Sequence, residues 1–182
     1  MTTKMSIKKS QLKEFIRDVP DFPQEGILFK DITTLLSHPE AFKKSIDLLA
    51  RQFKGKNVDV IVGVESRGFI FGAPLAYKMG ASFVPVRKKG KLPYKTKSVT
   101  YELEYGSDTL EVHEDAIPKG ANVLIVDDLL ATGGTVQAVV DLVQKQTSNI
   151  VGVAFLIELK FLKGKSKIQD MGDFDIYSLI KY

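Results

Sequence analysis

The stretch 122–135, NVLIVDDLLATGGT, constrains the fold of this chain more than any other feature. Its residues Val123–Val126 form a short apolar run, which is typical of a strand buried on both faces. Two carboxylates, Asp127 and Asp128, follow this run, and we expect the strand to stop there. A glycine turn comes next, and then an amphipathic run to about Lys145 that predicts a helix. This strand–turn–helix order indicates an α/β fold.

The residues of this turn suit a phosphorylated sugar: Ala131, Thr132, Gly133, Gly134 and Thr135. Glycines let backbone N–H groups come close to a phosphate, and the N-terminus of the following helix adds a positive potential. Thr132 and Thr135 have hydroxyl donors, and Thr135 is the predicted N-cap. The two carboxylates are acceptors for a sugar diol or, through water, for Mg²⁺. The stretch therefore predicts a site for a ribose 5-phosphate.

Other nucleotide-binding and hydrolytic motifs do not fit. No lysine follows the Gly-Gly pair, as a Walker A loop would require. The acidic residues precede the turn, whereas in a dinucleotide fingerprint the acid lies well downstream. The sequence GVESRG at 63–68 is one residue out of register with a serine-hydrolase elbow. For the residues taken alone, an ordinary strand–turn–helix with a solvated acidic pair stays open as the alternative.

Composition sets broad limits on the chain. A length of 182 residues with 44% hydrophobic content predicts a single domain, 1–182. Cysteine is absent, which excludes disulfides and thiolate metal sites, and no run approaches the roughly 18 apolar residues of a membrane span. We expect a cytoplasmic protein without a membrane anchor. The net charge of +4 is concentrated at 87–97, where a basic stretch can bind nucleic acid or a small polyanion.

The remaining chain alternates between helix-like and strand-like segments. Helices are expected over 8–18, 39–53 and 69–79, strands over 58–64, 82–86, 150–157 and 174–179, and a β-hairpin over 97–114 with its turn at 106–108. The segment 22–31 has no clear period and is expected to be a shaped loop. Together these segments predict an α/β domain with a mostly parallel central sheet flanked by helices.

Several separated motifs resemble type I phosphoribosyltransferases, and in particular the adenine phosphoribosyltransferases. Besides the acidic pair with its ATGGT turn, they are FPxxGIxFxDIT from Phe22, the SRG turn, RKxGKLP from Arg87, LEYG at 103–106 and ELxxLKG from Glu158. The resemblance extends from about Phe22 to Lys167. Two departures are Lys30, where most relatives have arginine, and Tyr94, where relatives usually have glycine.

The resemblance implies a role for each matching residue. Ala131–Thr135 would hold the 5-phosphate of phosphoribosyl pyrophosphate (PRPP), and Asp127 and Asp128 its ribose hydroxyls. The pyrophosphate would be held by Ser66, Arg67, Arg87, Lys88 and Lys91, with a non-proline cis peptide between Glu65 and Ser66. Adenine would be bound by Leu28, Phe29, Lys30 and Leu159. Glu104, beside the PRPP-binding residue Tyr105, would close onto the purine as the catalytic acid/base, with Arg67 as the second catalytic residue.

The implied reaction is transfer of the phosphoribosyl group from PRPP to adenine, which gives AMP and pyrophosphate. Mg²⁺ would be carried by PRPP and pyrophosphate, with no direct protein ligand. The resemblance also implies a homodimer, a base-covering hood at 22–36, a flexible β-hairpin flap at 95–114 and the PRPP motif at 123–135.

Two alternatives stay open. The first is a phosphoribosyltransferase for another base, such as a 6-oxopurine or orotate, although 22–31 and Glu104 favour adenine. The second is a PRPP-sensing regulator that binds nucleic acid without turnover. We expect no nucleic-acid binding, because the roughly 20 residues before Phe22 leave no room for a winged helix.

Overall fold

The computed structural model describes residues 7–102 and 106–182. They fall into two compact units, Met1–Leu48 and Leu49–Tyr182. The first unit contains the 3₁₀ helix η1 (Lys9–Phe15), strands β1 (Arg17–Pro20) and β2 (Leu28–Asp31), and helix α1 (Thr33–Leu36). Helix α2 (Pro39–Gln52) begins in the first unit and ends in the second.

Strands β1 and β2 correct the prediction for the N-terminal part of the chain. They form an antiparallel pair in which Asp18 lies opposite Lys30, and the Lys30 Nζ is 2.6 Å from the Asp18 Oδ1. The expected helix over 8–18 is wrong beyond Phe15, and the expected loop 22–31 ends in a strand. Each strand is only four residues long and shows no regular alternation of buried and exposed positions, so local periodicity does not reveal it.

The second unit is built on a seven-stranded sheet with the order β5-β6-β4-β3-β7-β8-β9. Its strands are β3 (Val60–Val64), β4 (Ser82–Lys88), β5 (Thr96–Glu102), β6 (Ser107–His113), β7 (Asn122–Leu130), β8 (Asn149–Glu158) and β9 (Asp175–Lys181). The five strands from β4 to β9 in this order are parallel, and the β5–β6 hairpin joins the edge of β4 in antiparallel orientation.

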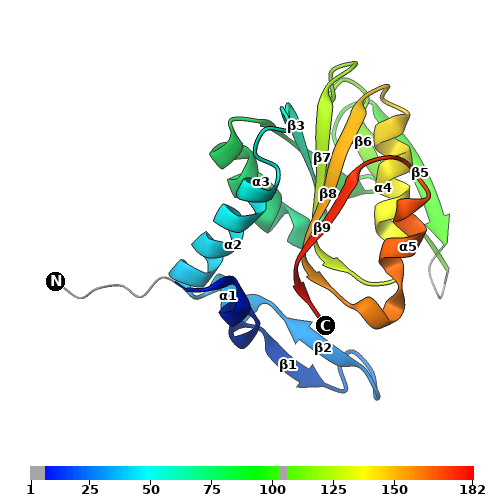
Figure 1. Ribbon diagram of the computed structural model, residues 1–182. Coiled ribbons are helices and arrows are strands. Elements are labelled where there is room, and N and C mark those ends of the chain that lie inside the picture. The colour runs from blue at the N-terminus through cyan, green and yellow to red at the C-terminus, as the bar shows by residue number, and fades with distance from the viewer. Residues whose placement is uncertain (1–6, 103–105) are drawn as a thin grey trace. The chain divides into compact units, whose positions relative to one another are not determined.

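Helices cover both faces of this sheet (Figure 1). Helix α3 (Arg67–Met79) lies on one face, and α4 (Gly134–Gln144) and α5 (Gly164–Gln169) lie on the other, with the 3₁₀ helix η2 (Lys160–Leu162) before α5. The sheet core is therefore covered on both sides, and every residue of β3 is buried. This arrangement confirms the predicted α/β fold with a mostly parallel sheet flanked by helices.

Helix α4 shows why the sequence folds in this way. Val136, Val139, Val140 and Val143 recur at helical spacing and are all buried against the sheet. Strands β5 and β6 pair as an antiparallel hairpin, as predicted, except that Ser107 and Asp108, expected in the turn, belong to β6. Within residues 7–102 and 106–182, no helix combines the length and hydropathy needed to cross a membrane.

Candidate active site

The acidic pair lies within β7 and not after it. Asp127 pairs with Phe155 of β8, and the strand continues to Leu130. The expectation that the strand stops at the carboxylates is therefore wrong. The neighbouring strand β8 remains in register beyond Asp127, so its backbone continues to pair with that of β7. As a result both carboxylates are fixed by the sheet at its carboxyl end, where parallel sheets bind ligands.

The two carboxyl groups have different neighbours. The Asp127 Oδ1 accepts a hydrogen bond of 2.8 Å from the backbone N–H of Asp128, and the Asp128 Oδ2 lies 2.8 Å from the Arg67 Nε. Burial raises the pKa of Asp127 well above its ordinary value, and the adjacent Asp128 charge raises it further. Burial also raises the pKa of Asp128, although Arg67 acts in the opposite direction. The pair thus has a high cost of ionisation.

The loop after β7 forms a small pocket. About 80 Å³ of space is lined by Asp127 and by the run from Leu129 to Val136. Gly133 has a φ of +90° and is the N-cap of α4, which begins at Gly134. The expected N-cap, Thr135, is wrong by two positions. The N-cap position has a left-handed backbone conformation, which favours glycine over threonine. Backbone N–H groups at the start of α4 nevertheless suit a phosphate.

Gly164 packs against this loop. A Cβ added at Gly164 would lie 2.1 Å from the carbonyl oxygen of Ala131, and one added at Gly133 would lie 2.9 Å from the carbonyl oxygen of Gly164. Backbone therefore meets backbone, with no side chain between them that could move aside. The sequence analysis missed this role of Gly164, although the residue lies in the ELxxLKG motif. In the same motif, the backbone N–H of Leu159 donates to the carbonyl oxygen of Leu130, 2.9 Å away.

The turn between β3 and α3 brings Arg67 to the acidic pair. The peptide bond between Glu65 and Ser66 is cis, which confirms the expectation from the resemblance. Ser66 is the N-cap of α3, and Arg67 is its first residue. A Cβ added at Gly68 would lie 2.8 Å from the Val126 carbonyl oxygen and 3.0 Å from the Asp127 Oδ1. Only glycine allows α3 to begin this close to β7.

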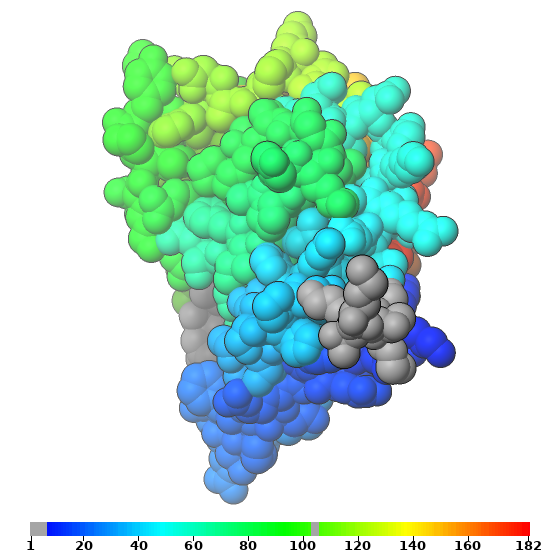
Figure 2. Space-filling model, turned by 90° about the vertical axis from the view of Figure 1, so that its left-hand side faces the viewer, coloured from blue at the N-terminus to red at the C-terminus, as the bar shows by residue number. Residues whose placement is uncertain are grey.

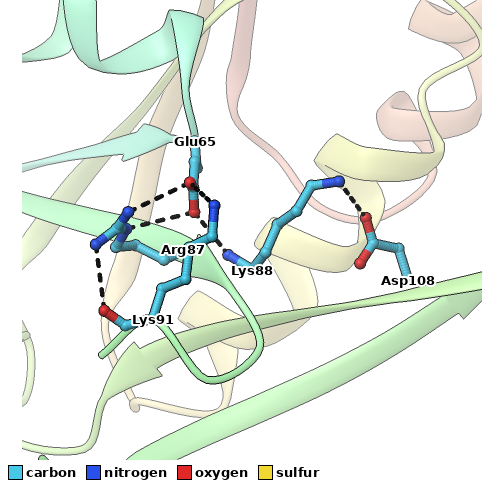
Figure 3. Close-up of polar contacts among 5 residues, drawn as sticks. All are labelled: Glu65, Arg87, Lys88, Lys91 and Asp108. Carbon is cyan, nitrogen blue, oxygen red and sulfur yellow. Dashed lines mark hydrogen bonds and ion pairs between the residues drawn. The ribbon is translucent and has the colours of Figure 1, made fainter. Parts of the chain in front are cut away.

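The end of β4 and the basic loop after it surround the Glu65 carboxylate (Figure 3). The Lys91 Nζ donates a hydrogen bond of 2.6 Å to the Glu65 Oε1, and the backbone N–H of Lys88 donates one of 2.9 Å to the Glu65 Oε2. The Arg87 guanidinium donates two hydrogen bonds of 3.3 Å to Glu65, from Nη2 to Oε1 and from Nε to Oε2. Burial acts to raise the pKa of Glu65, but the hydrogen bonds from Lys91, Lys88 and Arg87 outweigh it and lower the pKa to about 2. Glu65 is therefore a carboxylate at neutral pH.

Lys88 points elsewhere. Its Nζ lies 3.0 Å from the Asp108 Oδ2 on β6, as Figure 3 shows. The hydrogen bond to Asp108 raises the pKa of Lys88, and the same bond lowers the pKa of Asp108. The Lys88 side chain thus belongs to a separate, more exposed ion pair with Asp108, near the start of β6.

The structure brings together most of the predicted site residues of the second unit. The Arg67–Asp128 ion pair and the close packing of the β3–α3 turn on β7 connect Ser66 and Arg67 with the acidic pair and the loop 131–135. Glu65, in the same β3–α3 turn, forms ion pairs with Arg87 and Lys91. Glu65 is a second residue that the sequence analysis missed, and its place directly after a buried strand, beside the SRG turn, was the available signal. Leu28, Phe29 and Lys30 lie in β2 of the first unit, where the Phe29 ring contacts Phe22. Glu104 and Tyr105 lie outside the described residues.

Comparison with known proteins adds the family. The family described as phosphoribosyl transferase domain matches residues 31–180. The adenine phosphoribosyltransferase of Acidobacterium capsulatum is 55% identical over 97% of this chain and 96% of its own length, and that of Solidesulfovibrio magneticus is 59% identical over 88% and 94%.

Solved structures agree with the sequence relatives. The crystal structure of adenine phosphoribosyltransferase from Thermoanaerobacter pseudethanolicus has a TM-score of 0.91 and 51% identity, and covers 96% of this chain and 100% of that one. The enzyme from Saccharomyces cerevisiae, solved with an imino-altritol bisphosphate and adenine, has a TM-score of 0.87 and 44% identity, and covers 94% and 97%.

Proposed function

Because this chain belongs to the phosphoribosyl transferase family and, within it, to the adenine phosphoribosyltransferases, we propose a role in the reaction for each part of the site. The enzyme acts in purine salvage and transfers the 5-phosphoribosyl group from PRPP to adenine, which gives AMP and pyrophosphate. The observation that carries the assignment of roles is the Arg67–Asp128 contact of 2.8 Å, because it joins the pyrophosphate turn to the acidic pair.

The 5-phosphate binds at Ala131–Thr135. Support comes from the 80 Å³ pocket beside the start of α4, whose size and backbone N–H groups suit one phosphate group. Asp127 and Asp128 accept hydrogen bonds from the ribose hydroxyls. Both are held in β7, so they are oriented before the substrate arrives.

The pyrophosphate binds between the β3–α3 turn and the basic residues at the end of β4 and in the loop after it. Ser66, Arg67, Arg87, Lys88 and Lys91 are the proposed ligands, with main-chain donors at the start of α3 and cationic side chains on β4 and the loop after it. Positive charge stabilises the leaving pyrophosphate as the bond to the anomeric carbon breaks. Tyr105, outside the described residues, is proposed to bind the same substrate.

Mg²⁺ is proposed to enter with PRPP. The acidic pair offers oxygen acceptors that can reach this cation through water, which fits a metal held by phosphate oxygens with no direct protein ligand. When bound, the cation neutralises charge on the pyrophosphate.

For the base, we propose contacts from Leu28, Phe29 and Lys30, and from Leu159. The side chain of Lys30 is engaged by Asp18, so we assign its contact with adenine to the main chain. Glu104 is proposed as the acid/base that hydrogen-bonds the purine, inside a flap at 95–114. Replacing Glu104 with leucine should lower kcat far more than PRPP affinity, and an unchanged kcat would remove it from the mechanism.

We further propose that the chain is a single domain with a hood at 22–36, that it forms a homodimer and that it acts in the cytoplasm. Helix α3 lies on the face that Figure 2 turns to the viewer. It exposes Tyr77 at 92% and Ile70 at 37%, seven positions apart and thus on one side of the helix. Light scattering on the wild type and on Tyr77→Lys tests this interface, and a monomeric wild type would contradict the dimer.

The experiment that tests the reaction offers adenine, hypoxanthine, guanine and orotate with PRPP and Mg²⁺, and follows pyrophosphate release. We expect turnover with adenine alone. Turnover with another base would keep the PRPP site but overturn the roles of 22–31 and Glu104. PRPP binding without turnover, together with salt-sensitive retention on DNA, would support the regulator.

A further inference from the structure

Glu65 occupies an unexpected place for a carboxylate. It lies at the carboxyl end of β3, in the turn that leads to Arg67, and its side chain is 9% exposed. Its backbone N–H donates to the Val86 carbonyl oxygen, 2.9 Å away, which fixes the turn against β4. A negative charge here lowers the positive potential that a polyanion requires, so its presence calls for a compensating role.

The geometry around Arg87 indicates that role. The Nε and Nη2 of the Arg87 guanidinium both donate to the Glu65 carboxylate. The third nitrogen, Nη1, donates a hydrogen bond of 3.2 Å to the Lys91 carbonyl oxygen. In the described part of the chain, these contacts use three of the five N–H donors of an arginine. In these contacts, Nη1 and Nη2 each use one of their two N–H groups. Arg87 can therefore bind Glu65 and a phosphate oxygen at the same time.

Lys91 is held in the same way. Its ammonium has three N–H donors, and one of them is directed at Glu65 Oε1 over 2.6 Å. A free lysine or arginine side chain has many rotamers, and immobilising it costs free energy each time a ligand binds. Glu65 immobilises both cations before the ligand arrives. Gly90 between them is fixed as well, because its backbone N–H donates to the Glu111 Oε2 over 2.9 Å.

We propose that Glu65 is a positioning residue of the pyrophosphate site: it holds Arg87 and Lys91 side by side so that both face a diphosphate group without rearrangement. The inference rests on the proposed function and deepens it. Glu65 does not contact the substrate; it acts through the two cations. Its carboxylate and the diphosphate share these cations and do not compete for them.

The test is Glu65→Gln, which keeps the shape of the side chain and removes its charge. We expect the KM for PRPP and the inhibition constant for pyrophosphate each to rise about tenfold, the size expected when hydrogen bonds to a charged group are lost. We expect the KM for adenine to stay within about twofold and kcat within about threefold. In an Arg87→Ala, Lys91→Ala background the same substitution should change the PRPP and pyrophosphate constants by less than about twofold.

Asp175→Asn is the matched control. It removes a carboxylate from an ion pair of intermediate length, Lys56 Nζ to Asp175 Oδ2 at 2.9 Å, at the start of β9 and away from the site. We expect it to leave all constants within about twofold. Thermal melting of each variant separates a loss of affinity from a loss of folding.

Several outcomes would overturn the proposal. Tighter binding of PRPP by Glu65→Gln would show that Glu65 competes with the diphosphate. An equal loss in the Arg87→Ala, Lys91→Ala background would show that Glu65 does not act through these cations. Unchanged constants in a folded Glu65→Gln variant would show that it has no positioning role. A wild type without turnover of adenine and PRPP would instead contradict the proposed function itself, which separates the two failures.

Discussion

Two groups of carboxylates lie at the carboxyl ends of the neighbouring strands β3 and β7, and their surroundings are opposite. Glu65 is surrounded by donors from Arg87, Lys88 and Lys91, and its pKa falls to about 2. Asp127 and Asp128 are adjacent to each other, Asp128 contacts Arg67, and burial raises the pKa of both carboxyl groups. The same chemical group thus stabilises one region and destabilises the other.

The difference follows the proposed substrate. A diphosphate needs a cationic surface. A carboxylate within that surface ionises readily, because the surrounding cations donate hydrogen bonds to it. A ribose diol needs acceptors, and burial raises the pKa of both proposed carboxylates despite the donors from Arg67 and the Asp128 backbone N–H. Ionising the buried pair lowers the stability of the folded state, and the proposed binding of a ribose diol requires these ionised acceptors. Four predictions test this contrast.

The largest effect is expected for the double substitution Asp127→Asn, Asp128→Asn. It should weaken PRPP binding about 100-fold, because hydrogen bonds from the hydroxyls to charged acceptors are lost. It should also raise the thermal midpoint, since two carboxyl groups with raised pKa values no longer have to ionise in the folded state. Calorimetric titration and melting measure the two effects. Asp115→Asn, at an exposed position, is the control, and unaltered PRPP affinity in the double variant would break the diol assignment.

The next effect concerns Gly164→Ala. Its Cβ would lie 2.1 Å from the Ala131 carbonyl oxygen, so the phosphate loop has to move. We expect the KM for PRPP to rise roughly 10- to 30-fold, with a smaller change for adenine. Gly172→Ala is the control, since its new methyl would meet only side-chain atoms of Phe174 and Gln144 that can turn aside. A KM for PRPP that is the same in both variants would show that the loop tolerates displacement.

A third effect is the acid dependence of stability. The pKa of Glu65 is lowered from 4.5 to about 2, so the folded state binds fewer protons than the unfolded state between these values. The stability that Glu65 contributes is complete above about pH 4.5 and is lost as the pH falls towards 2. It amounts to at most about 3 kcal/mol, the free-energy equivalent of this shift. Urea unfolding between pH 6 and 2.5 should show a flatter profile for Glu65→Gln than for wild type, and parallel profiles would contradict the prediction.

The smallest effect is expected for Asp108→Asn. The pair with Lys88 is exposed on the lysine side, at 56%, and pairs of this kind contribute roughly 0–1 kcal/mol. We expect the free energy of unfolding to fall by less than about 0.5 kcal/mol and the KM for PRPP to change by less than about twofold. A tenfold change in KM would mean that Asp108 holds Lys88 as firmly as Glu65 holds Arg87.

The contrast also shows what the sequence could predict. The buried strands were predictable because runs such as Val60–Val64 have no polar residue to limit them. The acidic pair and the glycine turn were predictable because their chemistry and their spacing occur together. The end of β7 was not, since its extension to Leu130 depends on pairing with β8, which lies about 20 residues downstream.

Contacts between backbones were also beyond the sequence. Gly164 is an ordinary glycine in its motif, and only the folded chain shows that it lies against Ala131. Glu65 could be placed at a strand end, but its three basic neighbours come from the end of β4 and the loop after it, more than 20 residues away. The β1–β2 pair was missed for a different reason: its strands are only four residues long and show no regular alternation of buried and exposed positions.

Strand β4 changes partners along its length, and this has a mechanical consequence. Ser82–Val86 pair with β3, whereas Arg87 and Lys88 pair with Glu111 and Leu110 of the hairpin. The β4 backbone is hydrogen-bonded to the central sheet at one end and to the hairpin at the other, so a displacement of Arg87 or Lys88 would be shared with β6. The hairpin has a second anchor on β5, because the Lys97 Nζ donates to the Lys145 carbonyl oxygen and to the Gln146 Oε1 at the end of α4.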